Sequence, residues 1–396
     1  MFRKMPFILV AILLAIVLLD PFLPLLVKQG LYSISLSIKA VIVLLLPFVI
    51  FGLLFKAAVT LSKGATKIIG MILMLVCCSN FISTWLSHYI GILIYHFDMS
   101  MIVPKKTNGF IALWSLKLPP LLANDKAMFA GLALGIVASL VQPNASQAIA
   151  HKIEQFINQL LKGFVYIIPL FVAGFVVKLQ EDGLIIMILK DYSAIFLLIA
   201  IAQFSYIAFV YLVLNNGRVK KCLHDIKNMT PAAISGFSTM SSAASMPLTI
   251  IGAEMNSSNK AIARTVVPLT VNIHLIGDCF AIPIFAYAVL KSFGMQEPSL
   301  LHYLTFVFYF IFAKFSVAAI PGGGIIVMLP ILESHLGFNA EMMSLITALY
   351  ILFDPVITCA NVLGNGAFSK LIDRLVAPAS DVQLAHERGQ KIPPLT

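Results

Sequence analysis

Apolar stretches about 20 residues long, enough for a helix to cross a hydrocarbon core of ~30 Å, recur along the whole chain of 396 residues. Hydrophobic residues make up 60% of the sequence and charged residues only 11%, and the mean hydropathy is +0.97. Because a soluble domain carries about 25% charged residues, a water-soluble fold could not cover this much apolar surface. The sequence therefore predicts an all-α polytopic membrane protein.

The distribution of charge supports this interpretation. The net charge is +10, which in a soluble protein would suggest nucleic acid as a partner, but here the basic residues gather in short loops. Short basic loops are typical of the cytoplasmic side of membrane proteins. The clusters are Arg3/Lys4, Lys63/Lys67, Arg218/Lys220/Lys221/Lys227 and Arg374/Arg388/Lys391. We therefore expect a lipid bilayer and no nucleic acid as partner, with both termini in the cytoplasm and the chain in a plasma (bacterial inner) membrane.

Six apolar segments in the first part of the chain are expected to be helices. They span about residues 7–27, 34–61, 66–97, 125–141, 146–178 and 193–214. Gly131 and Gly135 in the fourth form a GxxxG pair, which lets two helices approach closely. The five cysteines are odd in number and show no metal-ligand spacing, so no metal site and no cofactor are expected.

The pattern changes after residue 229. Residues 230–256 are apolar but rich in serine, and both flanks are of the cytoplasmic type, which predicts a re-entrant hairpin with its tip at the serine run. Residues 302–336 are apolar but interrupted by Pro321-Gly322-Gly323-Gly324, which cannot continue a helix. Helices are expected at about 261–290 and 340–376. Paired interrupted segments of this kind favour a transporter binding site, since irregular backbone inside a membrane must line a cavity or be buried in protein.

Four motifs in this half resemble the dicarboxylate/amino acid:cation symporter family, which includes the glutamate transporters. They are the serine-rich tip and proline at 239–247, Val267-Pro268-Leu269 before a broken helix, Pro321-Gly322-Gly323-Gly324, and Asp354 with Thr358 and Asn361. The resemblance implies eight transmembrane helices plus two re-entrant hairpins with inverted repeats. It also implies a homotrimer in which a transport domain slides against a scaffold, the elevator mechanism.

The resemblance further implies a division of the chain. Residues 1–229 would form the N-terminal six-helix half, whose helices one, two, four and five make the scaffold while helices three and six join the transport domain. Residues 230–377 would form the transport core, and residues 378–396 a cytoplasmic tail. The partner would be a small-molecule substrate.

The chain departs from the family pattern at three positions. The family reads asparagine-methionine-aspartate-glycine-threonine in its broken helix, where this chain has His274-Leu275-Ile276-Gly277-Asp278. The cation-binding aspartate is thus Ile276, a second one is Asn365, and the arginine that binds an acidic side chain falls at Ile357.

These departures predict the substrate. A buried carboxylate that loses its cationic partner costs roughly 3–5 kcal/mol, so without arginine at 357 and with Asp278 added, acidic substrates should bind poorly. Asp354 can accept from an α-amino group, while Asn361 and the serine tip can donate to an α-carboxylate. The candidate substrate-binding residues are Ser241, Ser242, Asp278, Pro321, Gly324, Asp354, Thr358 and Asn361. We expect a small neutral or basic amino acid; the alternative is a Na⁺-coupled symporter of dicarboxylates or acidic amino acids, as in the family.

The same departures bear on the coupling ion. Sodium prefers anionic oxygen ligands, and this chain lacks the two aspartates that supply such ligands in the family. His274 and Asp278 are four residues apart, so we expect them to share one helix face, where they could relay a proton. Candidate coupling residues are Asn272, His274, Asp278, Asn361 and Asn365. Proton coupling or exchange is therefore a hypothesis beside sodium coupling.

Three other classes of protein remain open at this point. A channel and a substrate-binding homologue that does not transport would share these motifs. An enzyme is the third class, because Gly277-Asp278 is similar to the glycine-aspartate pair of intramembrane aspartyl proteases. That pattern requires a glycine where this chain has Leu275, so we do not expect an enzyme.

Overall fold

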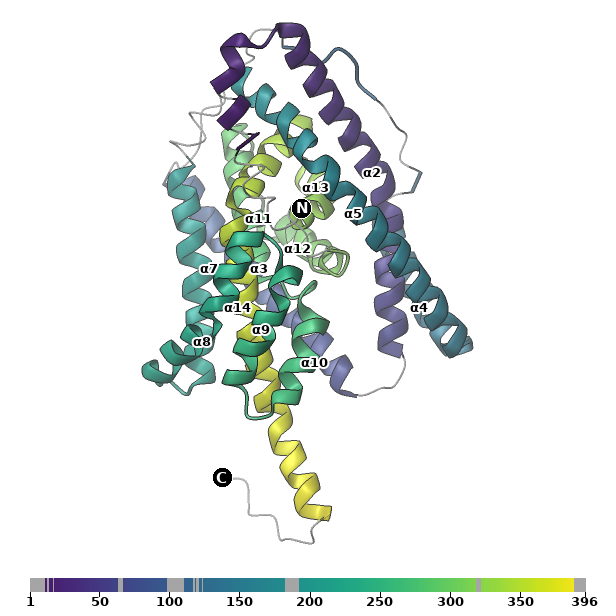
Figure 1. The fold of residues 1–396 in the computed structure, drawn as a ribbon, viewed down its shortest axis with the longest axis vertical. Helices are drawn as coiled ribbons and strands as arrows, with labels where there is room; N and C mark the ends of the chain where they lie inside the picture. Colours follow the sequence, from purple (N-terminus) through teal and green to yellow (C-terminus); the bar gives the residue numbers. More distant parts are fainter. Residues whose placement is uncertain are drawn as a thin grey trace.

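The computed structural model describes residues 11–97, 110–181, 192–317 and 322–387, apart from positions 13, 17, 63–66, 117, 119, 120 and 123. All regular structure within these residues is helical (Figure 1). Three of the described helices contain a stretch long and apolar enough to cross a membrane: Gly70–His96, Ser193–Leu214 and Glu341–Val376. Shorter apolar helical stretches accompany them, among them Phe129–Val141, Leu300–Lys314 and Gly323–Leu336.

One group of helices lies along the top and right of Figure 1, where α2 and α5 run side by side and α4 packs on α2. The group consists of η2 (Asp20–Phe22), α2 (Leu25–Ser62), α4 (Asn124–Val141) and α5 (Pro143–Glu181). The predicted GxxxG pair lies at the contact between α2 and α4. A Cβ at Gly131 would lie 2.5 Å from the Phe51 carbonyl oxygen, and one at Gly135 would lie 2.6 Å from that of Phe55. Only glycine allows the two backbones this close.

The boundary expected between the first two helices was wrong. Helix α2 begins at Leu25 and not near residue 34, and the chain breaks earlier, at η2. The sequence interpretation had treated Lys28 as part of a loop. In the fold, the Lys28 ammonium is buried and lies 2.8 Å from Asp20 and 2.5 Å from Glu181. Because its charge is paired, the helix continues through it. The start of the first expected helix lies outside the described residues.

The second group contains the remaining helices, with α14 running along its length (Figure 1). Its members are α3 (Lys67–His96), α7 (Ser193–Leu214), α8 (Val219–Thr239), α9 (Ser242–Asn256), α10 (Lys260–Thr270), α11 (Ile276–Ser292), α12 (Leu300–Lys314), α13 (Gly323–Leu336) and α14 (Ala340–Glu387). Helix α11 lies at the centre, and every residue from Ile276 to Leu290 is buried. The two groups meet where α5 contacts α14, α4 contacts α12 and α2 contacts α13.

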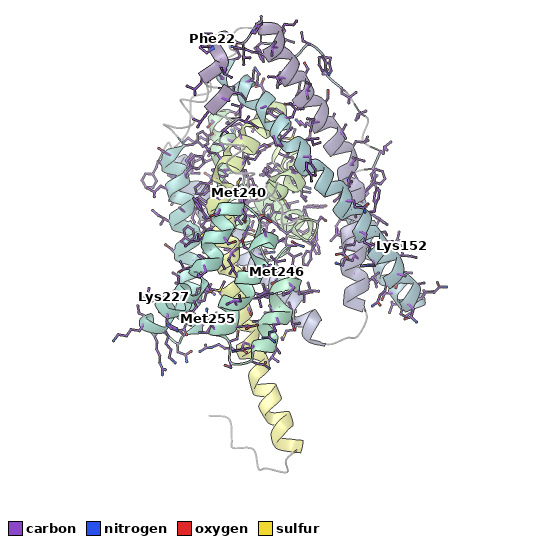
Figure 2. All side chains as sticks on the ribbon, viewed as in Figure 1. Phe22, Lys152, Lys227, Met240, Met246 and Met255 are labelled. Atoms are coloured by element: carbon purple, nitrogen blue, oxygen red, sulfur yellow. The ribbon has the colours of Figure 1, made fainter. Side chains whose placement is uncertain are left out.

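Helices α8 and α9 form the first predicted hairpin. The turn is at Met240, whose left-handed backbone (φ 51°) ends α8, and at Ser241, which caps α9. Figure 2 shows Met240 near the middle of the molecule, while Lys227 and Met255 lie toward the open end of the hairpin. The serine run is thus the tip, as predicted.

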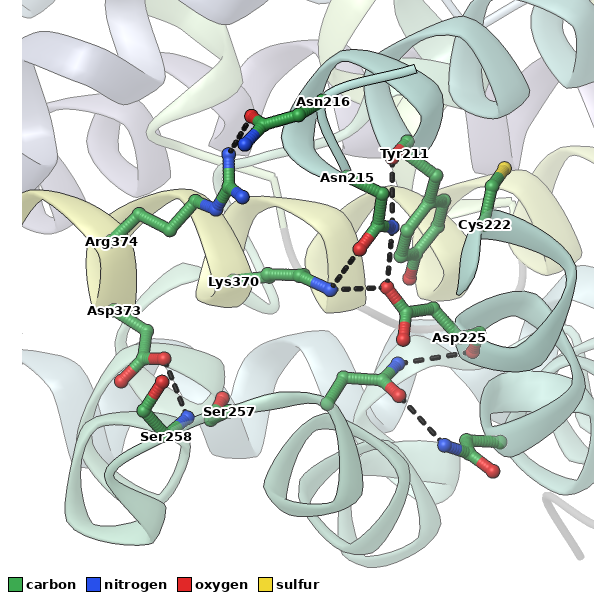
Figure 3. A network of polar contacts seen from close by, with 12 residues as sticks. Tyr211, Asn215, Asn216, Cys222, Asp225, Ser257, Ser258, Lys370, Asp373 and Arg374 are labelled. Atoms are coloured by element: carbon green, nitrogen blue, oxygen red, sulfur yellow. Dashed lines mark hydrogen bonds and ion pairs between the residues drawn. The ribbon is translucent and has the colours of Figure 1, made fainter. Parts of the chain in front are cut away.

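The first arm of this hairpin begins at Val219, eleven residues before the expected start at residue 230. Two buried aspartates near the open end of this hairpin are paired in the fold (Figure 3). Asp225 accepts from Asn215 at 2.7 Å and forms an ion pair with Lys370 of α14. Asp373 accepts from the backbone N–H groups of Ser258 at 2.6 Å and Asn259 at 3.0 Å, which ties the turn between α9 and α10 to α14.

Helices α12 and α13 form the second predicted hairpin, whose tip includes Gly322. Pro321 lies outside the described residues. The last helix was expected to end near residue 376, but α14 continues to Glu387. The first ten residues of the predicted tail at 378–396 are therefore helical, and residues 388–396 lie outside the described part.

Candidate functional site: a broken helix between two hairpin tips

The helix expected at 261–290 is broken, because α10 ends at Thr270 and α11 starts at Ile276. Two asparagine amides replace the helical hydrogen bonds that the break removes. Asn80 of α3 donates to the Ile273 carbonyl at 2.8 Å and accepts from the Leu275 N–H at 3.4 Å. Asn365 of α14 donates to the His274 carbonyl at 3.2 Å. Buried backbone groups need such partners, so these side chains hold the break open.

Helix α14 also holds the first turn of α11. The Gly277 N–H donates to Asn361 Oδ1 at 2.8 Å. A Cβ at Gly277 would contact the Ile357 carbonyl oxygen and lie 3.1 Å from Asn361 Oδ1, so this close approach requires glycine. At Ile276, where the family carries an acid, the side chain is buried against Gly364, whose Cβ would lie 2.9 Å from Ile276 Cδ1. An aliphatic contact therefore fills that position.

His274 lies inside the break. Its Nε2 is 2.8 Å from Ser79 Oγ of α3, and its ring lies 4.4 Å from that of Phe368. Its Nδ1 is buried without a hydrogen-bond partner among the described residues. The expectation that His274 and Asp278 share one helix face was wrong, because the spacing rule holds only for a continuous helix and α11 begins between them.

Asp278 is instead paired with Lys314, the last residue of α12. The Lys314 ammonium lies 3.0 Å from Asp278 Oδ2, and the Tyr350 hydroxyl donates to Oδ1 at 2.8 Å. The side chains of Lys314 and Asp278 are 0% and 2% exposed. Gly324 lies against this pair, since a Cβ there would lie 2.6 Å from Asp278 Oδ2 and also contact the Tyr350 hydroxyl.

Lys314 and Tyr350 were missed by the sequence analysis. Lys314 carries a signal of its own, because an ionisable residue within an apolar segment is expensive and marks a functional position. Its partner is 36 residues away, on a helix that the sequence does not orient toward it. Tyr350 carries no such signal.

Asp354 lies one turn before Thr358 on α14 and faces the tip of the second hairpin. Its Oδ2 accepts from the Gly322 N–H at 2.9 Å, and its Oδ1 accepts from the Thr358 hydroxyl at 3.0 Å. Gly322 has a φ of 71°, which favours glycine. Within the described part of the chain, no lysine or arginine pairs with the Asp354 carboxylate.

The tip of the first hairpin approaches the same turn of α14. A Cβ at Gly236 of α8 would lie 3.3 Å from the Thr358 carbonyl oxygen. Ser241 accepts from the Ala244 N–H at 3.2 Å and so caps α9, and Ser242 is buried at the first position of that helix. Asn272, in contrast, is exposed, so the fold does not bring it among these buried groups.

Long apolar helices, two helical hairpins and a broken helix with buried polar groups together define a membrane transporter. The chain belongs to the sodium:dicarboxylate symporter family, whose model matches residues 126–375. No curated protein matches the chain. The family resemblance inferred from the motifs is thus confirmed.

The family consists of cation-coupled symporters of dicarboxylates or amino acids and not of enzymes. The chain is therefore an integral membrane protein with a small-molecule substrate. The expectation that the chain is not an enzyme is thus confirmed, and the alternative of an intramembrane protease is excluded.

Proposed function

We propose that this chain is a secondary active transporter of a small neutral amino acid. The observation that carries the proposal is the difference between two buried carboxylates. Asp278 is neutralised by Lys314, whereas Asp354, at the tip of the second hairpin, has no cationic partner within the described residues. A buried charge without a partner favours a ligand of opposite charge, and the α-amino group of an amino acid is such a ligand.

The charge of the site argues against an acidic side chain on the substrate. When Asp354 is ionised, two carboxylates and one ammonium leave one negative charge in excess. Ile357, where the family has the arginine that binds acidic side chains, is buried and apolar. Asp278 was expected to disfavour acidic substrates, but Lys314 neutralises its charge. Lys314 does not attract acidic substrates either, because its ammonium is already paired with Asp278. For the same reason Asp278 is not open to a basic side chain, which favours neutral over basic substrates.

Donors for the α-carboxylate are available at the first hairpin tip and on α14. Ser241 and Ser242 form the first tip, and Thr358 and Asn361 lie on α14 beside it. Thr358 and Asn361 also bond Asp354 and Gly277, so a substrate bound here would reach both hairpins and the broken helix at once. This coupling of substrate to several mobile elements is what alternating access requires.

We propose an elevator mechanism for the movement. The first expected helix, α2, α4 and α5 would form the scaffold, and α3 and α7 to α14 the moving domain, with eight transmembrane helices and two re-entrant hairpins in all. The sparse connections between the two groups, through α5–α14, α4–α12 and α2–α13, support this division. As in the family resemblance, the assembly would be a homotrimer in a plasma (bacterial inner) membrane with cytoplasmic termini.

The coupling ion is proposed to be a proton, with sodium as the second candidate. His274 is buried in the break with one ring nitrogen unpaired among the described residues, and its backbone carbonyl accepts from Asn365. Histidine is the side chain that most readily changes charge near neutral pH.

Uptake by purified protein in liposomes tests the proposal. Labelled neutral, basic and acidic amino acids and C4-dicarboxylates would each be offered under a sodium gradient, a proton gradient and neither. We expect the fastest uptake for a small neutral amino acid. Preferential uptake of aspartate or succinate would instead support the dicarboxylate alternative, and substrate-dependent thermal stabilisation without uptake would mark a non-transporting homologue. Currents far above carrier turnover would mark a channel.

A further inference from the structure

Lys314 is the last residue of α12, the arm that leads to the tip of the second hairpin. Its side chain is fully buried, and its ammonium lies 3.0 Å from Asp278 and 4.6 Å from the centre of the Phe310 ring. A buried ammonium is costly to maintain in an apolar segment. The last residue of α12 therefore carries a charge for a reason other than packing.

The ion pair joins three elements at one point. Lys314 comes from α12, Asp278 from the first turn of α11, and Tyr350, which donates to the second oxygen of Asp278, from α14. Gly324, in the first turn of α13, leaves no room for a side chain beside the carboxylate. Both arms of the second hairpin are thus fitted against the Asp278 carboxylate, so the pair lies where the hairpin closes on the broken helix.

We propose that the Lys314 ammonium is a resident cation that takes the place of a coupling ion beside Asp278. A buried carboxylate at a hairpin closure requires a positive charge, and hard cations such as sodium bind such oxygens. Here the positive charge is tethered to the hairpin itself. The second hairpin accordingly closes on an internal ion pair, and the transport cycle needs no sodium ion at this position. The inference rests on the proposed transport function, but not on the identity of the substrate.

Stability alone does not account for the pair. A buried ion pair is often no more stabilising than apolar residues of the same volume. A pair of leucines could join α11 to α12 equally well. What the pair adds is a fixed positive charge next to a carboxylate, which an apolar contact could not supply.

The experiment is the thermal unfolding of purified, substrate-free protein while sodium chloride replaces choline chloride at constant ionic strength. In Lys314→Met the Asp278 carboxylate lacks its cation, so we expect sodium to raise its Tm by about 3 °C more than that of the wild type once sodium exceeds its Kd about 100-fold. Lys314→Met/Asp278→Asn, which lacks both charges, should respond to sodium as the wild type does. Lys291→Met, which removes another lysine from the α11 region, is the matched control and should also respond as the wild type.

Lys314→Gln is the second variant, because its amide can still donate to Asp278 while the charge is gone. A sodium response in Lys314→Met or Lys314→Gln equal to that of the wild type overturns the inference. If neither variant folds, the comparison of Lys314→Met/Asp278→Asn with the wild type decides: an equal sodium response supports the inference, and a smaller response in the double variant, which would show that Asp278 binds sodium in the wild type, overturns it. Because the unfolding measurement contains no substrate, a wrong substrate assignment would leave its result unchanged.

Discussion

Asp354→Asn is the substitution that acts most directly on the proposed substrate site. Asparagine keeps the size of the side chain; its amide oxygen can still accept from the Gly322 N–H, and its amide nitrogen can donate to the Thr358 hydroxyl, the two groups that donate to the Asp354 carboxylate at 2.9 and 3.0 Å in the wild type. What it removes is the negative charge opposite the proposed α-amino group. Loss of one partner of a buried charge pair costs about 3–5 kcal/mol, so affinity should fall by about two to three orders of magnitude.

A graded series makes this prediction specific. Thr358→Ala removes one hydrogen bond to the Asp354 carboxylate, which is worth about 1.5–3 kcal/mol, so it should weaken binding by about tenfold to a hundredfold. Thr347→Ala is the matched control, because Thr347 is buried on the same helix but donates only to the Met343 carbonyl, at 2.6 Å. It should leave affinity unchanged.

The assay is equilibrium binding of the labelled substrate to protein in lipid nanodiscs, with thermal unfolding as a check on folding. The expected order of affinity is wild type and Thr347→Ala together, then Thr358→Ala, then Asp354→Asn. A folded Asp354→Asn protein that binds within threefold of the wild type would refute the role of Asp354. Thr347→Ala that weakens binding as much as Thr358→Ala would show that the effects come from the helix and not from the site.

Three further predictions follow from the contacts around the broken helix. Lys314→Met should lower the free energy of unfolding by about 3–5 kcal/mol because it leaves a buried carboxylate unpaired, and adding Asp278→Asn should restore most of that loss in a double-mutant cycle followed by thermal unfolding; purely additive effects would contradict the pairing. Gly324→Ala should cost about 1–3 kcal/mol and slow uptake, because its methyl group would displace Asp278 or Tyr350, whereas an unchanged Tm and uptake rate would show that the hairpin closes elsewhere. His274→Ala should abolish the pH dependence of uptake measured at a fixed sodium gradient; a variant that keeps the wild-type pH profile rules out His274 as the proton carrier.

The sequence was most informative where local chemistry decides the backbone. Serine and glycine runs cannot continue a helix easily, so the two hairpin tips were placed correctly at Met240 and near Gly322. Apolar length alone gave α3, α4 and α7 nearly to the residue. These features depend on neighbours in the chain and need no knowledge of the fold.

The errors arose where distant residues pair. Lys28 and Asp225 fall between the expected helices, but Glu181 and Lys370 neutralise them, so α2 and α8 extend through them. The spacing of His274 and Asp278 suggested a pair, but the break in the helix separates them and Lys314 takes the place of the histidine. Such contacts join positions 36 to 153 residues apart, and no local pattern contains that information.

The most direct test of the central claim is competition for uptake in liposomes. Uptake of the best labelled neutral amino acid would be measured with excess unlabelled alanine, serine, lysine, aspartate or succinate outside. The account predicts strong inhibition by small neutral amino acids and little by aspartate or succinate, because the site offers the Asp354 carboxylate and no free cation among its described residues. Inhibition by aspartate or succinate equal to that by the neutral amino acids would contradict it.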